Sequence, residues 1–156
     1  MCGIVGYVGP KSTVDVLLGG LKRLEYRGYD SAGVSVINES GVLETRKKAG
    51  KLGILVEDIA EHPLGQAHIG IGHTRWATHG APTTLNAHPH KAGPVAVVHN
   101  GIVENFKELR TELNALGLTH ETDTDTETVA LLTQYYMSQG HSPQEAAQKT
   151  IARLEG

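Results

Sequence analysis

The only cysteine of the 156-residue chain, Cys2, stands directly after the initiator methionine. Removal of Met1 would leave a thiol and a free α-amino group on the same residue. An α-amine has a reference pKa of ~7.7–8.0, so a useful fraction of it is neutral near pH 7. A neutral amine can take the proton of a nearby thiol, directly or through one water, and so activate it. The pattern indicates an N-terminal cysteine nucleophile; the alternative is an incidental residue on a frayed terminus.

The residues that follow favour the first interpretation. Residues 3–9 are apolar and β-rich, so we expect a buried strand that fixes the terminus in place.

A polar run that leaves a predicted strand could bind a carboxylate. Residues 73–80 read His-Thr-Arg-Trp-Ala-Thr-His-Gly. Arg75 offers a planar fork suited to one carboxylate, and Thr78 and His79 can add hydrogen bonds to the same anion. The alternative is that Arg75 forms a surface ion pair and Trp76 belongs to the core.

Asp125 lies in an acidic loop and can pair with an ammonium group. The alternative is that Asp125 only caps the helix that follows it. Both roles are compatible, because a capping carboxylate can present one oxygen to a ligand. An arginine and an aspartate that face one pocket would recognise both charged ends of a free amino acid.

The pair Asn100-Gly101 follows another predicted strand. The side-chain amide of Asn100 and the backbone N–H of Gly101 are hydrogen-bond donors that could stabilise the oxyanion of a tetrahedral intermediate. The alternative is an ordinary hairpin turn, for which Asn-Gly is the commonest signal.

Nine histidines raise the possibility of a metal site, above all His88 and His90 together with His73, His79 and His99. Their spacing matches no Cys/His zinc pattern. We therefore expect no metal and no cofactor, and interpret these residues as scattered polar and core histidines.

The positions of the apolar residues predict the elements that hold these side chains. A mixture of strands and helices without regular alternation is typical of the α+β class. Strands are predicted over 32–37, 42–48, 69–74 and 94–99. Helices are predicted from Ser12 to Gly28, over 50–61 and 106–116, after Asp125, and after Ser142-Pro143.

The length fits one domain with a real core. A formal net charge of −3 gives no reason to expect nucleic acid or an acidic membrane as a partner. A single cysteine fits a reducing compartment, and neither a signal peptide nor an apolar run long enough to span a membrane is seen. The cytoplasm is therefore the expected location.

Five motifs in this order resemble those of the class II glutamine amidotransferases. Within this family the chain is most similar to the glutaminase part of the members that make amino sugars from fructose 6-phosphate. The motifs lie at residues 1–6 (MCGIVG), 24–33 (LEYRGYDSAG), 73–80 (HTRWATHG), 86–90 (NAHPH) and 98–102 (VHNGI).

The resemblance implies an α+β, N-terminal-nucleophile hydrolase fold, a four-layer αββα sandwich that is incomplete in this chain. It also implies a role for each site residue: Cys2 as nucleophile with its own α-amine as base, Asn100 and Gly101 as oxyanion hole, Arg75, Thr78 and His79 on the glutamine carboxylate, Asp125 on its ammonium group, Trp76 in shielding and ammonia transfer, and Arg27 in supporting Cys2.

The resemblance further implies that residues 1–156 are a glutaminase domain without its C-terminal part and without the sugar isomerase domain. Such a fragment would at most release ammonia from L-glutamine, and its bare sheet edges and apolar faces would favour self-association. Two alternatives stay open: the glutaminase domain of another class II amidotransferase, and a non-catalytic amino-acid-binding module.

Overall fold

The structure of the protein, a computed structural model, describes residues 2–25, 28–77 and 80–156. Three of the predicted site residues, Arg27, Thr78 and His79, lie outside the described residues. The elements are, in chain order, β1 (Gly3–Val8), α1 (Thr13–Arg23), β2 (Ser31–Asn38), β3 (Leu43–Ala49), α2 (Leu52–Glu61), β4 (Ala67–Arg75), β5 (His90–Ala92), β6 (Val95–Val97), α3 (Phe106–Ala115), α4 (Thr126–Ser138) and α5 (Pro143–Ile151).

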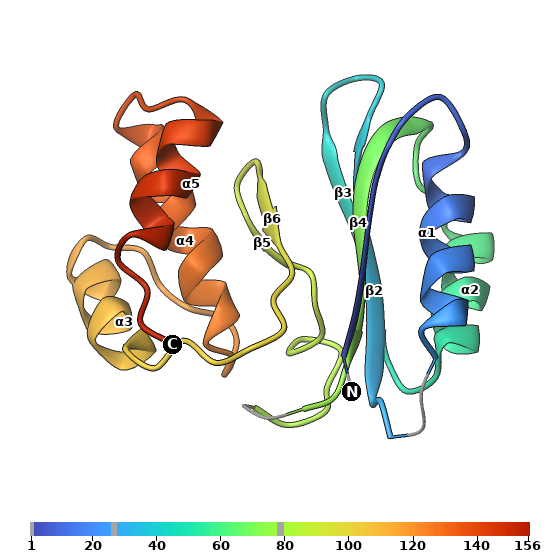
Figure 1. Ribbon diagram of the computed structural model, residues 1–156, viewed down its shortest axis with the longest axis horizontal. Coiled ribbons are helices and arrows are strands. Elements are labelled where there is room, and N and C mark those ends of the chain that lie inside the picture. The colour runs from blue at the N-terminus through green and yellow to red at the C-terminus, as the bar shows by residue number, and fades with distance from the viewer. Residues whose placement is uncertain (1, 26–27, 78–79) are drawn as a thin grey trace.

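These elements form four layers (Figure 1). Helices α1 and α2 cover one face of a four-stranded sheet, and helices α3 to α5 lie on the far side of the β5–β6 hairpin. The order helix, sheet, sheet, helix agrees with the α+β class and the αββα layering expected from the sequence.

Strand β4 lies at the centre of the site's architecture. The four-stranded sheet has the order β1-β4-β2-β3, and every pairing in it is antiparallel. Gly3 at the start of β1 lies opposite Thr74 near the end of β4, and the N–H of Gly3 donates to the Thr74 hydroxyl at 3.1 Å. The register therefore brings Cys2 to the end of β4, where the polar run 73–80 begins.

The prediction that the first strand is buried is only half right. Strand β1 is an edge strand, and Ile4 and Val8 on one of its faces are 42% and 77% exposed. Val5 and Tyr7, on the other face, pack against the core under α1 and α2. Within the described residues, the sheet that faces the four-stranded sheet has two strands, and Ile37 and Ile69 of the larger sheet are 39% and 43% exposed.

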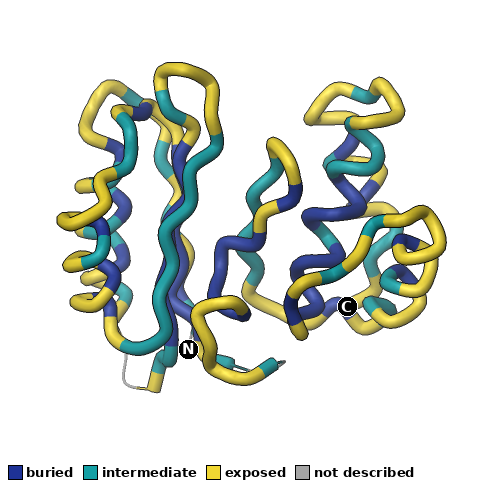
Figure 2. The backbone as a smooth tube through the Cα atoms, turned by 180° about the vertical axis from the view of Figure 1, so that it is seen from behind, coloured by how far each residue is buried: buried dark blue, intermediate teal, exposed yellow. Residues whose placement is uncertain are grey.

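Two apolar cores stabilise the layers (Figure 2). One joins α1 and α2 to the larger sheet, and Leu17 and Leu21 of α1 are completely buried in it, as the helical spacing predicts. The other joins the β5–β6 hairpin to α3, α4 and α5. The helix α1 ends at Arg23, which is earlier than predicted, and its N-cap Ser12 makes no side-chain capping bond.

The C-terminal half follows the sequence signals more closely. Ser142 forms a capping box with Glu145 at the start of α5, and Gly117 follows α3 in a left-handed conformation (φ 80°). The short strand β5 was not predicted. No strand follows Gly101 before α3, so the interpretation of Asn100-Gly101 as a hairpin turn is wrong.

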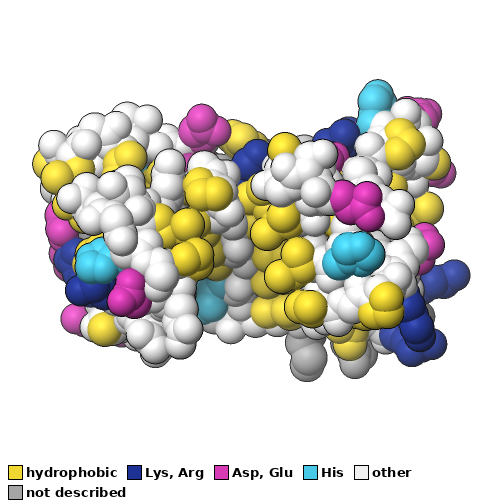
Figure 3. Space-filling view, turned by 90° about the horizontal axis from the view of Figure 1, so that it is seen from above, with side chains coloured by type: hydrophobic (Ala, Val, Ile, Leu, Met, Phe, Trp, Pro, Cys, Tyr) yellow, Lys and Arg dark blue, Asp and Glu magenta, His cyan; other side chains and the backbone are white. Residues whose placement is uncertain are grey.

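Seen from above, hydrophobic side chains gather in a cleft between the two halves of the molecule (Figure 3). This apolar cleft has a volume of about 340 Å³. Its lining comes from the inner face of the larger sheet, from the β5–β6 hairpin and from the C-terminal helices: Ser35, Val36, Ile37, Leu43, Ile69, Gly70, Ile71, Pro94, Val95, Ala96, Thr133, Met137 and Pro143. Among the residues that the structure describes, no helix is both long and apolar enough to span a membrane.

Candidate active site

Cys2 is held by contacts from three different segments. The backbone N–H of Trp76 donates to the Cys2 Sγ at 3.0 Å. The Nδ2 of Asn100 donates to the carbonyl oxygen of Cys2 at 3.2 Å, and the next residue, Gly3, is bonded to Thr74. A terminus with these contacts is not frayed.

The position of Trp76 depends on Asp30. The N–H of Asp30 donates to the carbonyl oxygen of Arg75 at 2.8 Å, and the Oδ2 of Asp30 accepts from the N–H of Ala77 at 2.5 Å. Both flanks of Trp76 are therefore fixed by one residue, which aims the Trp76 N–H at Cys2. We call this arrangement the Asp30 clamp.

The side chain of Trp76 is 46% exposed, so the interpretation of Trp76 as a core residue is wrong. Its ring lies against the backbone of Gly28, where a Cβ atom would stand only 2.5 Å from a ring carbon. Gly28 also has a φ of 94°, so glycine is required there for two reasons.

Arg75 is a buried residue and not a surface ion-pair former, since its side chain is only 4% exposed. Its guanidinium group donates to the carbonyl oxygens of Gly80 and Ala81, each at 3.2 Å, and lies 4.0 Å from the carboxylate of Asp30. Residues 80 and 81 of the polar loop thus turn their carbonyl oxygens toward the positive charge.

Asp125 stands at the N-cap position of α4 but its side chain makes no capping bond, so the capping interpretation of that carboxylate is wrong. The Oδ2 of Asp125 instead accepts from the N–H of Val103 at 2.7 Å. Since Asp125 is 5% exposed, a buried negative charge fixes the segment that follows Asn100 and Gly101.

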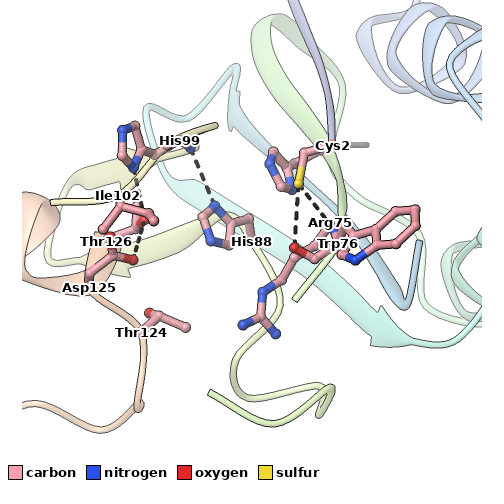
Figure 4. Close-up of a pocket in the computed structure, with 11 residues that line it drawn as sticks. Cys2, Arg75, Trp76, His88, His99, Ile102, Thr124, Asp125 and Thr126 are labelled. Carbon is pink, nitrogen blue, oxygen red and sulfur yellow. Dashed lines mark hydrogen bonds between the residues drawn. The ribbon is translucent and has the colours of Figure 1, made fainter. Parts of the chain in front are cut away.

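These side chains surround one cavity of about 260 Å³ (Figure 4). Cys2, Arg75 and Trp76 approach it from one side, and Asp125, Thr126 and Ile102 from the other. The full lining is Cys2, His73, Arg75, Trp76, His88, His99, Gly101, Ile102, Thr124, Asp125 and Thr126. The structure therefore brings the predicted nucleophile, the predicted anion-binding arginine, the predicted ammonium-binding aspartate and Gly101 into one hollow.

Asn100 makes contacts at the site that the sequence does not predict. Its side chain is absent from the cavity lining and bridges Cys2 and His73, whose Nε2 lies 2.7 Å from the Asn100 Oδ1. One of the two Nδ2 hydrogens is used by the Cys2 carbonyl. A role in the oxyanion hole stays a prediction.

Three histidines form a buried stack beside the cavity. The rings of His73 and His88 are stacked with centroids 4.4 Å apart, and the edge of His90 meets His88 at 4.6 Å. Burial lowers the pKa of His73 to about 4 and that of His90 to about 3, and it lowers the pKa of His88 further still. All three are therefore neutral at pH 7, and none supplies a positive charge to the cavity.

Within residues 2–25, 28–77 and 80–156, no group of three or more His, Cys, Asp or Glu side chains is arranged to hold a metal ion. The imidazoles of the stack serve other bonds: His90 Nε2 lies 2.9 Å from the Thr124 hydroxyl, and His88 Nδ1 accepts from the N–H of His99 at 3.4 Å.

The contacts that Asp30 and His73 make at the site were not predicted from the sequence. Asp30 follows Tyr29 in a turn-rich motif, and His73 lies in a strand; neither position shows which distant backbone group its side chain meets. The sequence feature that could have drawn attention to His73 is that it is a polar residue within a predicted apolar strand.

The fold and this site agree with the comparisons to known proteins. The family model for the glutamine amidotransferase domain matches residues 58–150. The chain belongs to this family of glutamine amidotransferase domains.

The curated relatives narrow the resemblance. The chain is 58% identical to the glutamine–fructose-6-phosphate aminotransferase (isomerizing) of Leifsonia xyli subsp. xyli and 59% identical to that of Streptomyces coelicolor. Each match covers the whole chain and 26% of the relative. The chain thus spans about a quarter of the length of these relatives.

Solved structures show the fold. The glutamine phosphoribosylpyrophosphate amidotransferase of B. subtilis, complexed with ADP and GMP, superposes on the whole chain with a TM-score of 0.81 at 24% identity, covering 33% of that protein. A structure described as the allosteric regulatory enzyme of purine biosynthesis matches equally well. The predicted N-terminal-nucleophile hydrolase fold is thereby confirmed.

Proposed function

We propose that this protein hydrolyses the side-chain amide of L-glutamine to glutamate and ammonia, with Cys2 as the nucleophile. The observation that carries the proposal is the shared cavity. A thiol, a buried positive charge and a buried negative charge, those of Cys2, Arg75 and Asp125, line the same hollow of about 260 Å³. Few small molecules other than a free amino acid present a carboxylate and an ammonium group for such a pair.

Each charge has one partner on the substrate. Arg75 binds the α-carboxylate, assisted by Thr78 and His79, and Asp125 binds the α-ammonium group. With both ends held, the side chain of glutamine extends toward Cys2. Asparagine is one methylene shorter, a difference usually worth ~1–3 kcal/mol in a pocket.

The chemistry then runs through a thioester. The sulfur of Cys2 attacks the amide carbon, and the N–H of Gly101 and the carboxamide of Asn100 stabilise the resulting oxyanion. Ammonia leaves with a proton from the α-amine of Cys2, and water hydrolyses the thioester to glutamate. In this proposal Trp76, whose backbone N–H bonds the Cys2 sulfur, shields the site, and Arg27 supports the Cys2 end.

The use of the ammonia belongs to a longer protein. We propose that residues 1–156 are the glutaminase domain of an enzyme that makes glucosamine 6-phosphate from fructose 6-phosphate and glutamine. The names of the curated relatives support this proposal. The fructose 6-phosphate site would then lie in a sugar isomerase domain, outside residues 1–156.

Two accompanying expectations stay predictions. The apolar cleft supports the expected self-association, which sedimentation would measure. The cytoplasmic location is consistent with a single free cysteine.

The decisive experiment measures glutamate release from L-glutamine. Cys2→Ala should abolish it, and a glutamine-like electrophile should label Cys2 of the unchanged protein. Intact mass identifies the fraction that retains Met1, which should be nearly inactive because its Cys2 nitrogen is an amide. Full activity of the Met1-retaining fraction would contradict the assignment of the base.

A non-catalytic amino-acid-binding module is the competing function, and turnover separates it from the enzyme, while two variants test the charge contact that both functions would use. Asp125→Asn keeps an acceptor for the Val103 N–H but removes the charge, so the KM for glutamine should rise by about 30-fold, equivalent to ~2 kcal/mol. Glu121→Gln makes the same charge change at an exposed position of the same loop and should leave KM unchanged. Glutamine binding without turnover by protein that lacks Met1 would favour the binding module.

A further inference from the structure

The two hydrogen bonds of the Asn100 side chain, to His73 and to Cys2, indicate which ring nitrogen of His73 carries a proton. The Oδ1 of Asn100 lies 2.7 Å from His73 Nε2, and the Nδ2 of Asn100 donates to the Cys2 carbonyl oxygen at 3.2 Å. A carbonyl oxygen can only accept a hydrogen bond. If the carboxamide of Asn100 were turned over, its oxygen would face the Cys2 carbonyl oxygen, and two acceptors would oppose each other.

The orientation of Asn100 in turn decides the state of His73. Because the Oδ1 of Asn100 also only accepts, the Nε2 of His73 must carry a proton. Burial of His73, which is 1% exposed, lowers its pKa to about 4, so at pH 7 the ring carries a single proton. The Nδ1 of His73 is therefore bare.

The bare nitrogen has a cost in stability. Among the residues that the structure describes, His73 Nδ1 is a buried polar atom with no hydrogen-bond partner. The ring stacks on that of His88, with the centroids 4.4 Å apart. The Nε2 of His73 contacts the side chain of Asn100, which also bonds the carbonyl oxygen of Cys2. Local violations of this kind are expected where a residue serves function.

We propose that His73 is a positioning residue of the glutaminase reaction: its Nε2–H holds the Asn100 carboxamide in one orientation, with Nδ2 turned toward Cys2 and the developing oxyanion. The inference rests on the proposed function. In this role His73, which lines the cavity, transfers no proton. It acts through Asn100, and without it the carboxamide can rotate and present its oxygen to Cys2, which would repel an oxyanion.

Two substitutions of similar length separate the hydrogen bond from the packing. His73→Gln can return an N–H donor to the position of Nε2, whereas His73→Met fills similar space without one. We expect His73→Met to lower kcat for glutamate release by about 10- to 100-fold, less than the roughly 10²–10³-fold loss typical of removing an oxyanion donor itself. KM should change by less than about threefold in both variants, because the Arg75 and Asp125 contacts persist. His73→Gln should recover most of kcat.

A double-substitution cycle tests whether His73 acts through Asn100. In the Asn100→Ala background, His73→Met should lower kcat by less than about twofold further. If it lowers kcat as much there as in the unchanged protein, or if His73→Met keeps the kcat of the unchanged protein, the inference is overturned.

The proton assignment is tested without any variant and without any activity. The nitrogen chemical shifts of the imidazoles, measured by NMR on the unchanged protein at pH 7, should show His73 with a protonated Nε2 and a bare Nδ1. The opposite tautomer or a doubly protonated ring would overturn the inference even if glutamine is hydrolysed. Absence of glutamate release by the unchanged protein would instead refute the proposed function.

Discussion

Removal of the Asp30 carboxylate should open the loop that aims Trp76 at Cys2. In Asp30→Ala the backbone bond from Asp30 N–H to the Arg75 carbonyl can persist. Two interactions are lost: the 2.5 Å hydrogen bond from the Ala77 N–H, and the 4.0 Å approach of the carboxylate to the Arg75 guanidinium.

The cost can be estimated from these two contacts. A hydrogen bond to a charged group contributes about 1.5–3 kcal/mol. Two unit charges 4 Å apart attract by ~4 kcal/mol at an effective dielectric constant of 20, most of which is offset by the desolvation of a residue as buried as Arg75. We therefore expect Asp30→Ala to lower the free energy of unfolding by about 3 kcal/mol. Asp30→Asn keeps an acceptor for Ala77 and should lower it by about 1 kcal/mol.

Urea denaturation with linear extrapolation measures both values. Glu39→Gln is a suitable control, because its ion pair with His68 is exposed and should contribute less than about 0.5 kcal/mol. Glutamate release should fall in the same order, with Asp30→Ala the lowest. If the alanine and asparagine variants are equally stable, or both are as stable as the unchanged protein, the Asp30 clamp does not fix the loop.

Three other predictions concern the supports of the site. Ser142→Ala removes one half of the capping box and should lower the free energy of unfolding in urea by about 1 kcal/mol, without affecting glutamate release. Gly33→Ala would place a Cβ only 2.1 Å from the His88 carbonyl oxygen, so calorimetry should show that the free energy of unfolding falls by about 1–3 kcal/mol. Unchanged stability would show that the backbone at His88 can move to accommodate the methyl group. Burial lowers the pKa of His90 to about 3, so between pH 6 and 4 the unfolded chain binds a proton on His90 that the native chain does not. The free energy of unfolding therefore decreases as the pH is lowered over this range. His90→Gln should reduce this slope by ~1.4 kcal/mol per pH unit in urea titrations, and an unchanged slope would mean that His90 is not buried and neutral.

Local sequence signals predicted the elements best where the signal acts within a few residues. The start of α5 after Ser142 and the extent of α3 are decided by neighbours in the chain, and α5 begins at Pro143 as predicted while α3 ends one residue before the predicted end. Strand β5 contains only three residues and lacks an apolar alternation, so its pairing with β6 depends on packing against α4 that no local pattern reveals.

The sequence predicted which residues belong to the site but not the hydrogen bonds that link them. Cys2, Arg75, Gly101 and Asp125 were identified from their chemistry, and the structure places all four around one cavity. The bond of Asp125 to Val103 links positions that are 22 residues apart, and that of Asn100 to Cys2 links positions 98 apart. Contacts of this kind depend on sheet register, which a single sequence does not contain.

The large sequence separation of these contacts has a consequence for the newly made chain. Cys2 is synthesised first, whereas the groups that bond it lie 74 and 98 residues later. At roughly 5–20 residues per second, the thiol exists for about 4–20 s before those partners have been translated. During that interval it is an ordinary cysteine, without an N–H aimed at its sulfur and without a pocket beside it. The proposed release of ammonia would therefore begin only after Trp76 and Asn100 have been synthesised and have folded around the terminus.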